Sequence, residues 1–162
     1  MNRTEGTEGL LDWSRSFLRD RGIHHFSEVD DEELAESFRA AFDIPAFIRL
    51  NDLREVCRTL GIVLEDLAPI SDELFGLNGW YDDGAPIISL NPDQANTRAQ
   101  HTLGHEVRET IENAFKRTGL QYNGLDTSDN PRMNPRSDRF ASRLLMPTHA
   151  SRELLEELGY DL

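Results

Sequence analysis

Two side chains that could bind one metal ion lie four residues apart in a segment with helical character. His105 and Glu109 occupy positions i and i+4, which share one face of an α-helix. An imidazole nitrogen and a carboxylate oxygen are both good zinc ligands. Glu106 is displaced from His105 by about 100° of helical rotation, where it can accept a proton from a water that the metal activates. Three fixed positions in five residues make a weak pattern, so an ordinary surface helix is the alternative interpretation.

The other histidines fit this pattern less well. His101 lies one turn before His105 on the same face. Ligands at 101, 105 and 109 would span about 12 Å of helix, too far for one ion on a straight helix. We therefore expect His101 to pack beside the site or support it. Polar or terminal contexts favour solvated roles for three more histidines, namely His24, His25 and His149.

The charge of the chain limits its partners. The 162 residues carry a net charge of −13, and an acidic surface repels phosphate backbones and anionic lipid headgroups. One group of arginines comprises Arg132, Arg136, Arg139 and Arg143. Asp129 and Asp138 dilute the positive charge of that group. We therefore expect no direct binding to nucleic acid or membranes, and a protein or peptide substrate, or a basic protein partner, fits the charge better.

The single cysteine and the absence of long apolar runs indicate a cytoplasmic location. Cys57 has no second cysteine to pair with, which suits a reducing compartment. It lies in a helical apolar pattern and is expected to be a small buried hydrophobe. The N-terminus lacks the features of a signal peptide, and no apolar stretch approaches 18 residues.

The elements that must position the candidate site follow from periodicity, caps and turns. Helices are expected over 9–21, 27–42, 51–60, about 97–117, 136–146 and 148–158. A short strand at 62–64 precedes a hairpin whose strands, 77–81 and 86–91, flank an Asp-Gly turn. Residues 1–8 are expected to be frayed and 119–135 to form a loop. The order predicts an α+β fold with a small, mainly antiparallel sheet against the helix that carries His105.

Several segments, in their order along the chain, resemble one known family. They are Leu60-Gly61-Ile62, the hairpin at 79–84, the strand at 87–91, Arg98, the helix start at 102–106, and the segment 139–147 ending in Leu-Leu-Met-Pro. With these features, residues 44–161 resemble the ImmA/IrrE-type metallo-endopeptidases. The resemblance implies a mostly helical, zincin-like domain over 44–162. Residues 1–43 are expected to form a helical segment that makes one compact unit with this domain. It also implies a zinc-dependent endopeptidase that cleaves a helix-turn-helix transcriptional repressor in a stress or mobile-element response.

The chain departs from the family pattern at two ligand positions. Where the family has the second histidine, this chain has Glu109, and its third ligand falls on Asn134. An amide oxygen is neutral and binds zinc weakly, so manganese or no metal are alternatives to zinc. Asp129 and Asp138 are the alternatives to Asn134 as the third ligand, although Asp138 matches a family position that is not a ligand.

These departures leave two functions open. In the first, His105, Glu109 and Asn134 hold the metal, Glu106 is the catalytic base, and the edge of the 80–91 hairpin binds an extended peptide by strand addition. In the second, the chain is a catalytically silent relative that acts as a protein-binding or regulatory module. Retention of His105 and Glu106 favours the enzyme, whereas the changes at 109 and 134 favour the silent relative. Arg108, at a position where the family usually has glycine, is expected to point to solvent.

Overall fold

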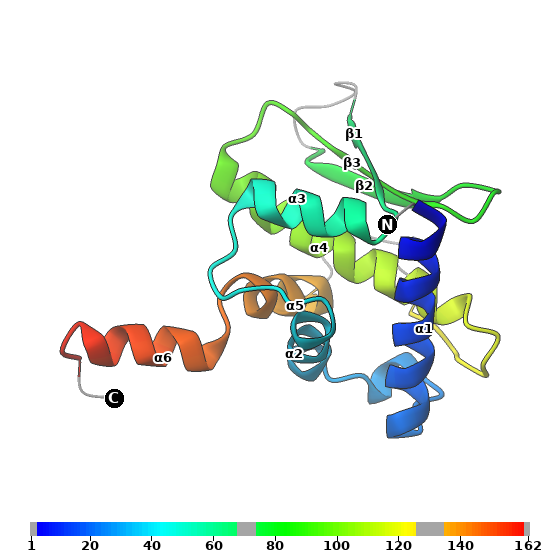
Figure 1. Ribbon diagram of the computed structural model, residues 1–162, viewed down its shortest axis with the longest axis horizontal. Coiled ribbons are helices and arrows are strands. Elements are labelled where there is room, and N and C mark those ends of the chain that lie inside the picture. The colour runs from blue at the N-terminus through cyan, green and yellow to red at the C-terminus, as the bar shows by residue number, and fades with distance from the viewer. Residues whose placement is uncertain (1–2, 68–73, 126–134, 161–162) are drawn as a thin grey trace.

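One small sheet lies at one side of a mostly helical fold in the computed structural model, which describes residues 3–67, 74–125 and 135–160 (Figure 1). The elements are α1 (Arg3–Arg21), a 3-10 turn (Phe26–Glu28), α2 (Asp31–Ala41), α3 (Leu50–Thr59), β1 (Val63–Asp66), β2 (Gly76–Trp80), β3 (Pro86–Leu90), α4 (Asn96–Lys116), α5 (Pro135–Leu145) and α6 (Thr148–Glu157). The predicted α+β class is confirmed. Among the described residues, no helix combines the length and apolar character that crossing a bilayer requires.

The sheet has the strand order β1-β3-β2. The predicted hairpin is present: β2 pairs antiparallel with β3, and Gly84, with a φ of 90°, takes the turn conformation that glycine tolerates best. β1 pairs parallel with β3, so the sheet is mixed. β1 and β3 run in the same direction because the chain reverses twice between them, once before β2 and once at the hairpin turn. β3 is therefore the central strand, and no described strand pairs with the outer edge of β2.

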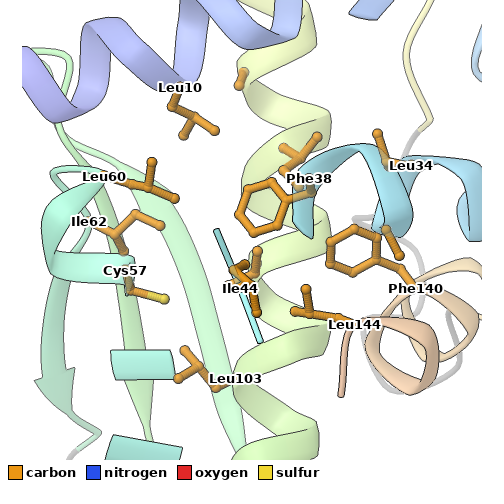
Figure 2. Packing of buried hydrophobic residues seen from close by; sticks show 14 of the residues in the cluster. Leu10, Leu34, Phe38, Ile44, Cys57, Leu60, Ile62, Leu103, Phe140 and Leu144 are labelled. Carbon is orange, nitrogen blue, oxygen red and sulfur yellow. The ribbon is translucent and has the colours of Figure 1, made fainter. Parts of the chain in front are cut away.

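The hydrophobic core surrounds α4, which lies between the sheet and the pair α2 and α5 (Figure 1). Phe17 of α1 stacks on Phe115 of α4 with ring centroids 5.8 Å apart. Phe38 of α2 and Phe140 of α5 meet edge to face, with ring centroids 6.0 Å apart (Figure 2). Cys57 is buried in this cluster, as predicted. Side chains before and after residue 43 thus share one core, while the domain division at that residue stays a prediction.

The first helix begins earlier than predicted. Residues 3–8 belong to α1, so a frayed end over residues 1–8 was the wrong expectation for that part. Gly6 is the reason, because it lies against the end of α3. A Cβ on Gly6 would stand 2.1 Å from the carbonyl oxygen of Thr59. The glycine that suggested a broken helix instead allows α1 and α3 to approach closely.

Candidate metal centre

The helix with the candidate ligands is held tightly against α5. A Cβ on Gly104 of α4 would stand 3.0 Å from the Cβ of Ala141, so position 104 lacks room for a larger residue without a shift of α5. The close crossing brings Asp138 of α5 within reach of α4. Its Oδ1 lies 3.2 Å from Nδ1 of His105 and 3.3 Å from Nε2 of His101. His101 therefore contacts the site through Asp138, in the supporting role predicted for it.

Three side chains of α4 could hold a metal ion. His105, Glu106 and Glu109 each offer a ligand atom, and these atoms lie within 4.8 Å of one another. All three residues are buried. Nε2 of His105 stands 3.4 Å from Oε1 of Glu109, and that oxygen, although buried, has no hydrogen-bond partner among the described residues. A buried, unsatisfied carboxylate oxygen beside an imidazole nitrogen fits a divalent cation, which both atoms can coordinate.

Asn78 of β2 was not among the predicted site residues. Its Nδ2 donates to Oε2 of Glu106 at 2.6 Å and to Oε2 of Glu109 at 2.5 Å. Its Oδ1 accepts from Nδ2 of Asn113 at 3.4 Å. The predicted hairpin contained the signal, because alternation along a strand puts Asn78 on the same face as Trp80. A polar residue on the strand face that turns toward the helix with the metal motif is a candidate site residue.

β2 lies directly on α4 at Gly76. A Cβ there would stand 2.7 Å from Cγ2 of Thr102 and 3.2 Å from Cγ of Glu106. Real Cβ atoms do not approach other atoms so closely, so glycine at this position sets the distance between β2 and α4. This approach is what brings Asn78, two residues later on the same face, to the carboxylates of α4.

The buried charges shift each other's protonation. Burial lowers the pKa of His105, but the nearby carboxylate of Glu109, with smaller contributions from Glu106 and Asp138, outweighs it and raises the pKa to about 9. Burial, followed by repulsion from Glu109, raises the pKa of Glu106 to about 7, although Asn78 and His105 oppose this. A carboxyl group with a pKa near 7 can both accept and release a proton at neutral pH.

Of the three candidates for the third ligand, the structure describes only Asp138. Asn134 and Asp129 lie outside the described residues. Asp138 faces Nδ1 of His105, whereas Glu109 faces Nε2 of the same ring. A carboxylate on the second ring nitrogen is the usual support of a metal-binding histidine, since it fixes the tautomer and the ring orientation. In this arrangement Asp138 is placed to orient His105, on the ring nitrogen opposite Glu109, and not to take the place of Asn134 as the third ligand.

The expectation that Arg108 points to solvent is wrong. Its side chain is 1% exposed, with Nε 2.8 Å from Oδ1 of Asp31 and Nη1 3.1 Å from Oε2 of Glu112. The hydroxyl of Tyr122 also donates to Glu112, at 2.8 Å. Asp31, at the start of α2, reaches this side of α4, so position 108 is an interior site, and burial of an arginine requires such paired carboxylates. Arg108 thus links α4 to α2, which lies in the N-terminal segment.

Comparison with known proteins gives one match. The family model of the IrrE N-terminal-like domain (Peptidase_M78) matches residues 59–162. No curated protein and no solved structure matches significantly. The match covers α4 to α6 and the hairpin, which are the elements that build the cluster of His105, Glu106 and Glu109. A metallopeptidase-type domain implies a metal cofactor and protein substrates, and this cluster is the candidate place for the metal.

Proposed function

The chain belongs to the family of IrrE N-terminal-like peptidases, and on this premise we propose that it is a metal-dependent endopeptidase. The observation that carries the proposal is the unsatisfied Oε1 of Glu109 beside Nε2 of His105. We assign these two atoms as metal ligands. Asn134 is our candidate for the third ligand, and zinc our candidate for the metal, with manganese favoured next by the oxygen-rich set.

Glu106 is the proposed general base. A bound divalent ion would act as a Lewis acid that polarises the carbonyl of the scissile peptide. Oε1 of Glu106 lies beside Gly76, on the side of β2, and its partner oxygen is bound by Asn78. Glu106 accepts a proton from the attacking water as the oxygen adds to the carbonyl carbon. It then delivers this proton to the amide nitrogen as the C–N bond breaks.

The outer edge of β2 is the proposed place for the substrate. The sequence suggested the edge of the whole 80–91 hairpin, but β3 is paired on both sides, so of the two hairpin strands only β2 has an edge without a described partner. An extended peptide added to β2 would run along the strand that carries Gly76 and Asn78. Main-chain hydrogen bonds to a strand edge bind peptides with little dependence on sequence.

The proposed substrate is a basic, DNA-binding protein. We propose a helix-turn-helix transcriptional repressor, cleaved in a stress or mobile-element response in the cytoplasm. A DNA-binding protein carries a basic surface, and a net charge of −13 on this chain attracts such a partner. The charge supports a basic protein substrate, and the resemblance to the ImmA/IrrE-type peptidases supports the repressor.

Peptide cleavage tests the proposal. The purified chain, supplied with zinc or manganese, is incubated with a library of peptides from a digested proteome, and new termini are identified by mass spectrometry. We expect cleavage that Glu106→Gln abolishes while metal content is kept, because the amide cannot accept a proton. Cleavage that persists in Glu106→Gln would contradict the assigned base. Metal-independent peptide binding without cleavage would favour the catalytically silent relative.

A further inference from the structure

The side-chain amide of Asn78 is fully used. Its two N–H bonds point to Glu106 and Glu109, one to each carboxylate. Its carbonyl oxygen accepts from Asn113 of α4, which fixes which end of the amide faces the carboxylates. The amide, which belongs to β2, thus bridges two acidic side chains of α4. Asn113, which binds the other end of the amide, is also on α4.

This bridge offsets an unfavourable arrangement. Glu106 and Glu109 are buried carboxylates close together, and like charges in a buried place repel strongly. A neutral amide that donates to both satisfies one oxygen of each without adding charge. The bridge occupies Oε2 of both residues, so Oε1 of Glu109 stays turned toward Nε2 of His105. The orientation of the proposed ligand atom therefore depends on a residue of the sheet.

We propose that Asn78 is a positioning residue of the metal centre, an amide clamp that holds the carboxylates of Glu106 and Glu109 together and directs Oε1 of Glu109 toward His105. The inference rests on the proposed function, because it assigns Asn78 a role at that site. The clamp contacts neither the peptide nor the cation in this assignment. It acts through the two glutamates, and Gly76 allows it by letting β2 lie on α4.

The first test uses the metal-free protein. Unfolding by denaturant is measured in chelator for Asn78→Ala, Glu109→Ala and the double variant. Because the amide donates to a charged acceptor, we expect the effects to be non-additive by at least about fivefold in the unfolding equilibrium constant. Leu77→Ala is the matched control, since Leu77 is the exposed neighbour on β2. Its effect should add to that of Glu109→Ala within about a factor of two. Additive effects for Asn78 and Glu109 would overturn the clamp.

The second test measures zinc affinity by calorimetry. Loss of a group that orients ligands typically costs about 10–100-fold in metal affinity, so we expect a loss of that size in Asn78→Ala and little change in Leu77→Ala. Bound cobalt(II) provides a second signature, because its visible absorption reports the ligand geometry. Unchanged affinity and an unchanged cobalt spectrum in Asn78→Ala would overturn the positioning role.

Two further variants cover the case in which Asn78→Ala folds poorly. Asn78→Ser keeps one donor, and Asn113→Ala keeps the amide but removes its support. Both should give losses of zinc affinity smaller than that of Asn78→Ala, and unchanged affinity in both would contradict the clamp. If the wild-type chain binds no metal at all, the proposed function fails, and the positioning role fails with it. In that case, non-additive effects of Asn78→Ala and Glu109→Ala on the stability of the metal-free protein would still show that the clamp exists, whereas additive effects would show that it does not.

Discussion

Asp138 and Glu109 approach His105 from opposite sides of its ring. Oδ1 of Asp138 lies 3.2 Å from Nδ1, and Oε1 of Glu109 lies 3.4 Å from Nε2. In the neutral ring that a metal ligand requires, donation of Nδ1–H to Asp138 would leave the Nε2 lone pair on the side of Glu109. Asp138 belongs to α5, so the tautomer of His105 depends on the close contact between α4 and α5 at Gly104.

Removal of this support should weaken metal binding more than folding. We expect Asp138→Ala to lower zinc affinity by about 10–100-fold, because the ring of His105 loses its fixed tautomer. The Asp138 side chain is half-exposed, so the cost in folding stability should be below about 1 kcal/mol. Calorimetric titration with zinc measures the affinity. Asp138→Asn keeps an acceptor oxygen and is the control with the smaller loss. Equal affinities in Asp138→Ala and the wild type would contradict this role.

The metal-free site should make the protein less stable as pH rises. The pKa of Glu106 lies at about 7 against its usual 4.5, and that of His105 at about 9 against 6.5. Both groups hold a proton more tightly in the folded chain, so their contribution is full below the usual values and is lost as pH rises through the folded ones. The loss from Glu106 should fall between pH 4.5 and 7, and that from His105 between 6.5 and 9.

Unfolding in chelator over this pH range, for the wild type and Glu106→Gln, measures the effect. The difference between the two curves should change between pH 4.5 and 7, since the variant lacks that titration. The sign reverses for metal binding: zinc competes with protons for His105, so zinc affinity should rise with pH up to about 9. Parallel stability curves for the two proteins would contradict the shifted pKa of Glu106.

The contact between β2 and α4 should not tolerate a side chain at Gly76. Gly76→Ala places a Cβ 2.7 Å from Cγ2 of Thr102, so we expect a loss of about 1–3 kcal/mol in stability together with weaker zinc binding, since Asn78 moves with the strand. Gly79→Ala on the same strand is the control, because its Cβ would meet Cγ2 of Ile87 at an ordinary 3.8 Å. Thr102→Ser in the Gly76→Ala background should restore part of both. Equal stability of the two alanine variants would contradict the close approach.

Arg108 should be far more important for folding than an exposed arginine. Among the described residues, Arg108→Ala leaves Glu112 buried without a cation, while Asp31 keeps only Arg136, and loss of one partner of a buried ion pair costs about 3–5 kcal/mol. Arg58→Ala removes an exposed pair with Glu55 and should cost no more than about 1 kcal/mol. Denaturant unfolding of the two variants gives the comparison. Similar losses would show that the buried network contributes little.

Local patterns predicted much of the fold. The Asp-Gly turn between apolar runs identified β2 and β3, and the i, i+4 spacing identified the face of α4 on which His105 and Glu109 lie. Periodicity and turn residues act over a few positions, so sequence alone can reveal them. The parallel pairing of β1 with β3 depends on which strand a distant segment joins, and no local pattern specifies that choice.

The contacts that sequence reasoning missed are long-range. Asn78 reaches Glu106 and Glu109 across 28 and 31 positions, and Arg108 reaches Asp31 across 77. A lone asparagine in a strand and a charged residue in a helix usually face solvent, so their types pointed the wrong way. Only the packing of β2 and α2 on α4 turns both inward. The polar residues of the site therefore depend on which elements pack on α4.

Metal content is the most direct test of the central claim, that His105 and Glu109 hold a catalytic metal. The chain is purified without chelators, and its zinc and manganese are measured by mass spectrometry beside those of Glu109→Ala. We expect close to one ion per chain in the wild type, lost in Glu109→Ala, and a higher melting temperature of the metal-free wild type when zinc is added. No bound metal, with a melting temperature that divalent ions leave unchanged, would contradict the account and favour the catalytically silent relative.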